Sequence, residues 1–355
     1  MISLASIAEK YQQQLFDKHG DKIQTVHQYA LKQIIACHTP QAGAMLYHCD
    51  HCQLATTLFP SCGHRHCPAC QHAANNDWLD CQRQKLLPVD YYLVGFTLPA
   101  QLRNFVWHHQ KWAYQALFIA AKETLDAFFK RDKKLGDHAG YIGVLHTHSR
   151  KLEFHPHVHF VVPAGGLNKS KTLWLSKAGN YLFVADNLAK VFRGKFIELM
   201  CEAGYYLPAQ TPKEWNADCE YVGRGDGALT YLARYLYRSV ISEQNILSLD
   251  NGQVTFRYKE SESKQFKTIT EPAVDFLWRV LQHVLPKGFR RARNYGFMHG
   301  NAKATLQRLQ LILKVRLQPA PIKQKKRVCC PQCQGEMQLY LLRIGMRLVI
   351  NGSTI

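Results

Sequence analysis

Five histidines lie within fourteen residues, from His146 to His159, in the segment HTHSRKLEFHPHVHFVV. The two ends of this segment have the apolar residues of strands, and the polar stretch SRKLE between them predicts a hairpin turn. Because side chains alternate between the two faces of a strand, His155, His157 and His159 share one face. A turn centred within SRKLE places His146 opposite His157 and His148 opposite His155. The hairpin is therefore expected to gather imidazoles on one face.

Such a gathering predicts a metal site, since desolvating so many imidazoles without a ligand would be costly. We expect His146, His157 and His159 to hold one divalent cation and to leave positions open for a substrate oxygen, as a catalytic metal requires. A single histidine in a strand is more often a core residue with satisfied hydrogen bonds. The third ligand depends on the assumed register, so His148 or His155 could replace His146, or a polar residue from elsewhere in the chain could serve.

The segment ALTYLARYLYRSVI predicts a helix with two tyrosines on one face. At about 100° per residue, Tyr231 and Tyr235 lie about 40° apart. Arg234 and Arg238 fall in the same stripe, whereas Tyr237 points away. A phenol beside an electrophilic metal centre can attack phosphorus and form an aryl phosphate, and guanidinium groups bind phosphate. In isolation such a stripe is more often ordinary packing, but the histidine hairpin favours nucleophilic tyrosines.

The chain has 12 cysteines, most of them clustered, which favours metal binding over disulfides. Cys49 and Cys52 form one CxxC pair, and Cys67 and Cys70 form a second pair after a gap of fourteen residues. Four thiolates at this spacing predict one structural zinc site. Other donors in the same stretch leave a second zinc or exchanged ligands open: Cys37, His38, Cys62, His64 and His66.

A smaller cysteine group lies near the end of the sequence, in the run CCPQC (329–333). Cys330 and Cys333 make only half of a zinc site, and no cysteine follows them. Completion of this half-site by residues from elsewhere in the chain and a pair of surface thiols are both open. The isolated Cys201 and Cys219 are interpreted as small apolar residues.

The elements that must position these groups fall into three expected regions. They are a helical start with a zinc-binding domain (1–88), a catalytic domain (89–300) and a basic C-terminal region (301–355). We expect a helix across Ile7–Tyr29, a buried strand at 91–99, one or two helices within Leu102–Arg131, and helices that begin near Asp186 and Asp226.

Charge predicts the partner. Lys and Arg number 45 against 26 Asp and Glu, for a net charge of +19, which favours binding to a polyanion. No apolar stretch approaches the roughly 20 residues that a membrane helix needs, and charges near the start argue against a signal peptide, so we expect a cytoplasmic protein without a membrane partner. If this polyanion is a nucleic acid, the candidate backbone contacts are Arg290, Arg291, Arg293 and Lys303, with Tyr295 and Phe297 able to stack on bases.

Several motifs together resemble those of the HUH nucleases, which are named for a histidine, hydrophobic, histidine triplet, here His157-Val158-His159. The chain is most similar to the two-tyrosine transposases of rolling-circle insertion sequences of the IS91 type. The motifs that carry this resemblance are RHCPAC (65–70), FTLP (96–99), the run from His146 to Gly166, YLARYLYR (231–238) and RNYGF (293–297).

The resemblance implies an α+β fold in which a central antiparallel sheet, flanked by helices, carries the HUH pair. An N-terminal zinc-ribbon-like module and a basic helical C-terminal region accompany it. The resemblance implies that Tyr231 and Tyr235 are nucleophiles, that His157 and His159 bind the metal, and that His146 is the third ligand.

The implied activity is metal-dependent nicking and rejoining of single-stranded or hairpin DNA through a 5′-phosphotyrosine. The implied cofactors are Mg²⁺ or Mn²⁺ at the histidines and structural zinc at the cysteines. A nucleoid-associated bacterial protein is then expected. Two alternatives stay open: a replication initiator or relaxase with the same chemistry, and a non-enzymatic zinc-finger protein that binds DNA.

Overall fold

The computed structural model of the chain describes residues 2–177, 179, 181–227, 229–230, 240–260, 263–315, 327–344, 347–350 and 353–354. It divides into two compact units that are each built from separate stretches of sequence. Unit 1 comprises 1–74, 237–284 and 321–355, and unit 2 comprises 75–236 and 285–320. Among the described residues, no helix combines the length and the apolar content that crossing a membrane requires.

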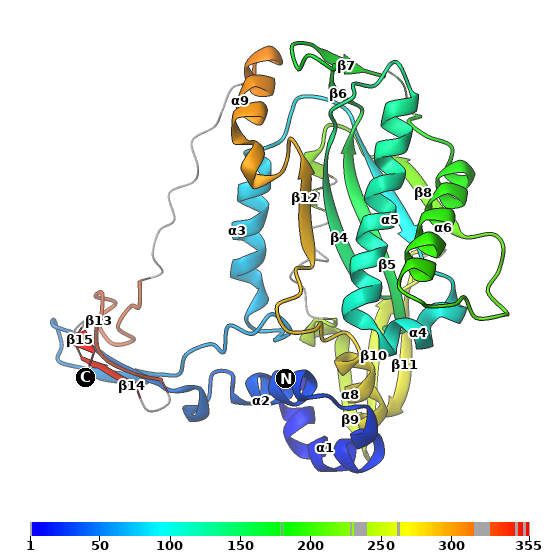
Figure 1. Ribbon diagram of the computed structural model, residues 1–355. Helices are drawn as coiled ribbons and strands as arrows, with labels where there is room; N and C mark the ends of the chain where they lie inside the picture. The colour runs from blue at the N-terminus through cyan, green and yellow to red at the C-terminus, as the bar shows by residue number, and fades with distance from the viewer. Residues whose placement is uncertain are drawn as a thin grey trace. The chain divides into compact units, whose positions relative to one another are not determined.

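An antiparallel sheet forms the centre of unit 2 (Figure 1). Its strand order is β12-β4-β5-β3-β8. The strands are β3 (Tyr91–Thr97), β4 (Gly140–His148), β5 (Phe154–Pro163), β8 (Asn216–Tyr221) and β12 (Ala292–Gly296). β4 and β5 are consecutive in sequence and paired, so the predicted histidine hairpin is present. The predicted buried strand at 91–99 is confirmed as β3, which is buried along nearly its whole length.

Helices cover one side of this sheet and bury aromatic side chains against it. Figure 1 shows α5 (Gln110–Arg131) and α6 (Ala185–Glu202) on one side of the sheet, preceded by the short α4 (Arg103–His108). The rings of Phe96 and Phe192 pack 4.9 Å apart, and Phe118 and Phe160 pack 6.3 Å apart. A helix that packs an apolar face against one side of a sheet leaves the other side of the sheet to carry polar groups. The remaining elements of unit 2 are α3 (Gln71–Arg83), β6 (Gly165–Leu167), β7 (Trp174–Ser176) and α9 (Lys303–Ile312).

Unit 1 contains helices packed on a small sheet. Its helices are α1 (Leu4–His19), α2 (Thr25–Ala36) and α8 (Ala273–Leu281), and one of its sheets has the order β11-β10-β9. These strands are β9 (Ile246–Asp250), β10 (Gln253–Lys259) and β11 (Phe266–Pro272). Phe256 of β10 contacts Phe276 of α8 at a ring separation of 5.4 Å. Lys18 of α1 pairs with Asp275 of α8 at 2.6 Å.

A second sheet of unit 1 joins the two ends of the sequence. Its order is β15-β14-β13-β1-β2. The strands are β1 (Ala44–His48), β2 (Ala55–Leu58), β13 (Gln338–Ile344), β14 (Arg347–Ile350) and β15 (Ser353–Thr354). β1 lies between its sequence neighbour β2 and the distant β13.

The α+β class and the central antiparallel sheet agree with the sequence prediction, but several boundaries differ. The three consecutive regions 1–88, 89–300 and 301–355 do not coincide with the two units, because strand pairing brings the last strands back to the first ones. The helix expected across Ile7–Tyr29 is interrupted at residues 20–24. Val184, and not Asp186, precedes the first residue of α6, so Asp186 lies within its first turn.

Candidate active site and metal centres

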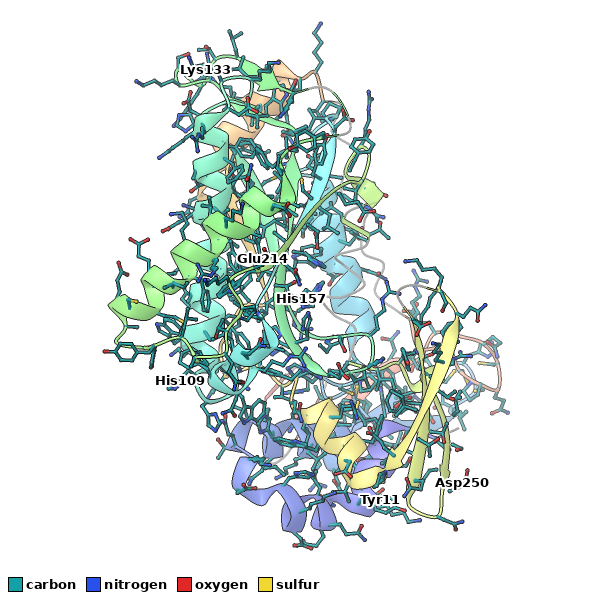
Figure 2. The ribbon with its side chains drawn as sticks, turned by 90° about the vertical axis from the view of Figure 1, so that its right-hand side faces the viewer. Tyr11, His109, Lys133, His157, Glu214 and Asp250 are labelled. Carbon is teal, nitrogen blue, oxygen red and sulfur yellow. The ribbon has the colours of Figure 1, made fainter. Side chains whose placement is uncertain are left out.

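Three histidine side chains converge on one face of the central sheet. His146 of β4 lies directly opposite His157 of β5, and His159 follows two residues later on the same face. Their ligand nitrogens all lie within 4.8 Å of one another, and His146 Nδ1 is 3.3 Å from His157 Nε2. Figure 2 marks His157 on its strand within unit 2. The expected grouping of these three imidazoles is therefore present in the structure.

The imidazoles are held in the neutral form that metal ligands need. His157 Nδ1 donates a hydrogen bond to the carbonyl oxygen of His155 at 2.7 Å, which leaves Nε2 unprotonated on the side of the cluster. Burial lowers the pKa of His159 to about 4, and burial together with the neighbouring imidazoles holds the pKa of His146 well below its usual value. The site is thus ready to accept a cation at neutral pH.

The other two histidines of the hairpin do not join this cluster. The structure confirms His146 opposite His157, but His148 faces Phe154 and not His155, because the register shifts between the two pairs. Between these two pairs the chain advances by three residues in β5 but by only two in β4. β5 therefore contains one extra residue, which is a β-bulge. Pro156 lies in the bulge, where its missing amide hydrogen costs no ladder bond. His155 instead accepts a hydrogen bond on Nδ1 from Arg103 at 3.1 Å.

A carboxylate that the sequence reading missed lies on the same face of the sheet. Gly95 of β3 pairs with His159 on one side and with Asp218 of β8 on the other. A Cβ atom built on Gly95 would lie 2.5 Å from Asp218 Oδ2, so the Asp218 side chain occupies the space above the glycine. Residues directly opposite one another share a face, so this carboxylate leans toward His159. Burial raises the pKa of Asp218. Only the strand pairing reveals this neighbour, which is 59 residues away in sequence from His159.

The donor set fits a catalytic cation. Three neutral nitrogens on one side leave coordination positions for oxygen ligands, which is the open arrangement of a reactive metal site. Asp218 lies across Gly95 from His159 in the register of the sheet, and its carboxylate in the ionised form would favour a divalent cation nearby. The positive charge of Arg291 lies close enough to contribute to the lowered pKa of His146, so a phosphate would meet a cationic surrounding here.

The predicted nucleophiles and their arginine neighbours lie outside the described residues. They are Tyr231, Arg234, Tyr235 and Arg238. The residues before them are described: 226–227 and 229–230 are helical, which agrees with a helix that begins near Asp226. Asp226 lies within the first turn, and its carboxylate accepts a hydrogen bond from Arg83 Nε of α3 at 2.9 Å.

A large groove runs along the free edge of the central sheet at β12. It has a volume of about 1350 Å³ and is lined by basic and aromatic side chains. The cations are Lys111, Lys287, Arg290 and Arg293, and the aromatic residues include Trp78, Trp112 and Tyr295. The lining thus combines cationic and aromatic side chains, a combination that sites for single-stranded nucleic acids use.

The predicted DNA contacts fall into three groups. Arg290, Arg293 and Tyr295 line the groove, although Arg293 is held 4.2 Å above the Phe118 ring and Tyr295 stacks on Phe160 at 5.9 Å. Arg291 lies toward the histidines instead, and Lys303 is exposed at the start of α9 outside the groove lining. The expectation that Phe297 stacks on bases is corrected: its side chain is buried against Gly140 and Trp174.

The cysteines form two four-thiol clusters, not the one that the CxxC spacing predicted. The first contains Cys37, Cys62, Cys67 and Cys70. Backbone amides donate to two of its sulfurs, from Cys62 to Cys37 Sγ at 3.5 Å and from His64 to Cys62 Sγ at 3.4 Å. Burial raises the pKa of Cys62 to about 12, so a bound cation is what would hold this thiol as thiolate.

The second cluster contains Cys49, Cys52, Cys330 and Cys333. The pair Cys49 and Cys52 is therefore separated from Cys67 and Cys70, which corrects the predicted ligand set. The physical reason is the pairing of β1 with β13, which places the CCPQC run beside the first CxxC pair. Of the two alternatives that the sequence left open for this run, the structure favours completion by residues from elsewhere. Cys329 is exposed and lies outside the cluster.

Comparisons with known proteins agree with this arrangement. Residues 140–305 match a family model described as "Putative transposase", and residues 5–98 match one described as "Transposase zinc-binding domain". The chain is 31% identical over 318 residues to the putative transposase y4qJ of Sinorhizobium fredii, covering 83% of this chain and 80% of that protein. It is 28% identical over 284 residues to the transposase for insertion sequence element IS801 of Pseudomonas savastanoi pv. phaseolicola, covering 75% of this chain and 68% of that protein. No solved structure gave a significant match.

Proposed function

This chain belongs to the IS91-type transposases with an N-terminal zinc-binding domain, and from this premise we propose that it nicks and rejoins single-stranded DNA through a 5′-phosphotyrosine. In this proposal it is a metal-dependent HUH endonuclease and strand transferase that acts in rolling-circle transposition. Family membership separates it from the two alternatives, a replication initiator and a zinc-finger protein without enzymatic activity.

The observation that carries the proposal is the convergence of three neutral imidazoles on one face of the sheet. His146, His157 and His159 place their ligand nitrogens within 4.8 Å of one another. A purely structural metal site would be closed by a fourth protein ligand. Here the described histidines supply three ligands, so an oxygen of the scissile phosphate could fill a further coordination position of a bound cation.

The tyrosines and arginines of this chain have separate roles in the proposed reaction. Tyr231 or Tyr235 attacks the phosphorus through its phenolic oxygen and loses its proton, and the 3′ oxygen leaves and takes up a proton. A bound Mg²⁺ or Mn²⁺ would supply Lewis-acid polarisation of a non-bridging phosphate oxygen. Arg234 and Arg238 hold neighbouring phosphates. The phosphodiester energy is kept in the tyrosine link, so the free 3′ hydroxyl can later attack it without ATP.

The DNA substrate is single-stranded or hairpin DNA, because the nucleophile needs an exposed phosphate. The groove at β12 supports this, with Lys111, Lys287 and Arg290 in its lining to follow the backbone and Trp78 to meet a base. Within a bacterium such a protein would act in the cytoplasm, associated with the nucleoid.

A denaturing gel tests the proposal directly. The protein is incubated with a labelled single-stranded element end and Mg²⁺ or Mn²⁺, and we expect an adduct that survives denaturant. Adduct formation should be lost in His157→Ala and in the Tyr231→Phe, Tyr235→Phe double variant. Tyr237→Phe is the matched control, since this tyrosine lies on the same segment but outside the predicted stripe. An unmodified protein that forms no adduct with any element end, or a double variant that still forms one, contradicts the proposal.

A further inference from the structure

The two CxxC turns of the second cysteine cluster have the same backbone geometry although they are far apart in the sequence. In the first, the Cys49 amide donates to Leu54 O and the Gln53 amide donates to Cys49 O, both at 2.9 Å. In the second, the Cys330 amide donates to Gly335 O at 2.8 Å and the Gln334 amide donates to Cys330 O at 2.9 Å. Each turn also has a glutamine with a positive φ, 62° at Gln53 and 59° at Gln334.

The four sulfurs face one another across these turns. Cys49 Sγ is 3.5 Å from Cys333 Sγ, and Cys52 Sγ is 3.4 Å from Cys330 Sγ. Tetrahedral Zn–S bonds of about 2.3 Å put sulfurs about 3.8 Å apart, whereas a disulfide requires about 2.05 Å. The spacing therefore fits one metal ion between the turns and excludes disulfides within the cluster.

Among the described residues, the apolar core around these turns is small, although β1 and β13 also pair as strands. Its buried members are Cys49, Cys330 and Met337, with partly buried neighbours such as Tyr47 and Val328. Small modules with so little apolar core usually need a metal, disulfides or oligomerisation to fold. A metal ion would supply what the apolar contacts lack.

We propose that Cys49, Cys52, Cys330 and Cys333 bind a second structural zinc, which fastens the C-terminal segment 327–344 to β1. The zinc-binding family model ends at residue 98, so it does not assign the two C-terminal ligands. The fastened residues are remote in sequence, since Cys52 and Cys330 are 278 positions apart. The zinc thereby closes a loop of chain that contains all of unit 2. This inference is independent of the catalytic proposal.

Zinc stoichiometry tests it. All proteins in this experiment carry His157→Ala, because three neutral imidazoles could also bind zinc. The full-length protein with all its cysteines, purified without added chelator, should hold two zinc ions per chain by elemental mass spectrometry. The Cys330→Ser, Cys333→Ser double variant should hold one, as should the matched Cys37→Ser, Cys62→Ser variant of the first cluster. Cys329→Ser is the control, because this exposed neighbour lies outside the cluster and should leave two. One zinc in the protein with all its cysteines, or two in the Cys330→Ser, Cys333→Ser variant, overturns the proposal.

A cleavage experiment keeps the test valid if that double variant fails to fold. A protease recognition sequence is inserted after Lys325 in the otherwise unmodified chain, and the protein is cut there. We expect the C-terminal fragment to co-elute with the rest on gel filtration and to separate when a mercurial reagent ejects the zinc. In the Cys37→Ser, Cys62→Ser background the fragment should still co-elute before zinc ejection. A fragment that separates while both zinc ions are retained contradicts the proposed site.

Discussion

The carboxylate of Asp218 occupies the space above Gly95, where a Cβ atom would lie 2.5 Å from its Oδ2 atom. Gly95 lies between Asp218 and His159 in the register of the sheet. The glycine thus allows a side chain from β8 to reach across β3 toward the histidine cluster. A carboxylate beside a metal-binding imidazole orients the ring and raises its basicity.

Asp218→Asn should weaken Mn²⁺ binding by about 10- to 100-fold, the usual effect of losing such a partner. The measurement is Mn²⁺ titration by calorimetry or electron paramagnetic resonance, without DNA. Gly95→Ala should have a similar effect, because the new methyl group displaces the carboxylate. In an Asp218→Ala background, Gly95→Ala should cause little further loss of Mn²⁺ affinity, since the carboxylate that would clash with the methyl group is absent. Additive losses from the two substitutions would contradict this coupling.

The histidine cluster makes its own prediction. His159→Ala should lower Mn²⁺ affinity by more than about 100-fold, because it removes a ligand and not only a neighbour of one. His148→Gln is the matched control: it lies on the same hairpin but faces Phe154 beyond the bulge, and should change affinity less than about threefold. If His148→Gln is as damaging as His159→Ala, the ligand set is wrong.

Much of this site follows from the sequence, and the remainder depends on pairing that the sequence does not display. Alternation along a strand was enough to place His157 and His159 on one face, and a short hairpin was enough to place His146 opposite His157. The bulge at Pro156 was missed because one extra residue in β5 leaves no mark on the local sequence pattern of the hairpin. Asp218 was missed because β8 pairs with β3 across a long stretch of chain.

The cysteines show the same limit. CxxC spacing identified each pair correctly as a unit, since the two thiols of a pair belong to one local turn. Spacing could not show which pairs combine, because that depends on β1 pairing with β13. The nearest pairs in sequence, at Cys49 and Cys67, lie in different clusters.

A buried histidine in unit 1 should make stability depend on pH. His27 of α2 is fully buried beside Trp278, and burial lowers its pKa from 6.5 to about 4. Below pH 6.5 the unfolded chain therefore binds a proton that the folded chain does not, so stability falls as the pH falls toward 4. From pH 7 to pH 5 this group should cost about 2 kcal/mol.

Urea unfolding of the protein and of His27→Gln at the two pH values measures this contribution. The variant should lose about 2 kcal/mol less than the unmodified protein over the same interval. Because both proteins contain the other titrating groups, including the cysteines, the contribution of those groups to the pH dependence cancels when the two proteins are compared. Equal pH dependence in both would show that His27 titrates normally.

The groove at β12 should control the electrostatic part of DNA binding. Arg290→Gln removes an exposed cation from the groove lining, so affinity for single-stranded DNA should fall and the slope of log affinity against log salt should decrease by about 0.7. Lys133→Gln is the control, because this exposed lysine lies outside the groove lining (Figure 2). Fluorescence anisotropy over a range of salt concentrations gives both slopes. An unchanged slope for Arg290→Gln would place the DNA elsewhere.

The central claim is a covalent bond between a specific phenol and the 5′ phosphate of DNA, and peptide mapping of the adduct tests it most directly. Trypsin cuts after Arg234, so it separates the peptide GDGALTYLAR, which contains Tyr231, from YLYR, which contains Tyr235 and Tyr237. Mass spectrometry of the nuclease-trimmed adduct should find a nucleotide on Tyr231 or Tyr235. Because YLYR contains two tyrosines, the Tyr237→Phe variant checks the assignment to Tyr235, which should not change. A nucleotide on any other residue, or a covalent adduct whose formation does not require His157, would contradict the account.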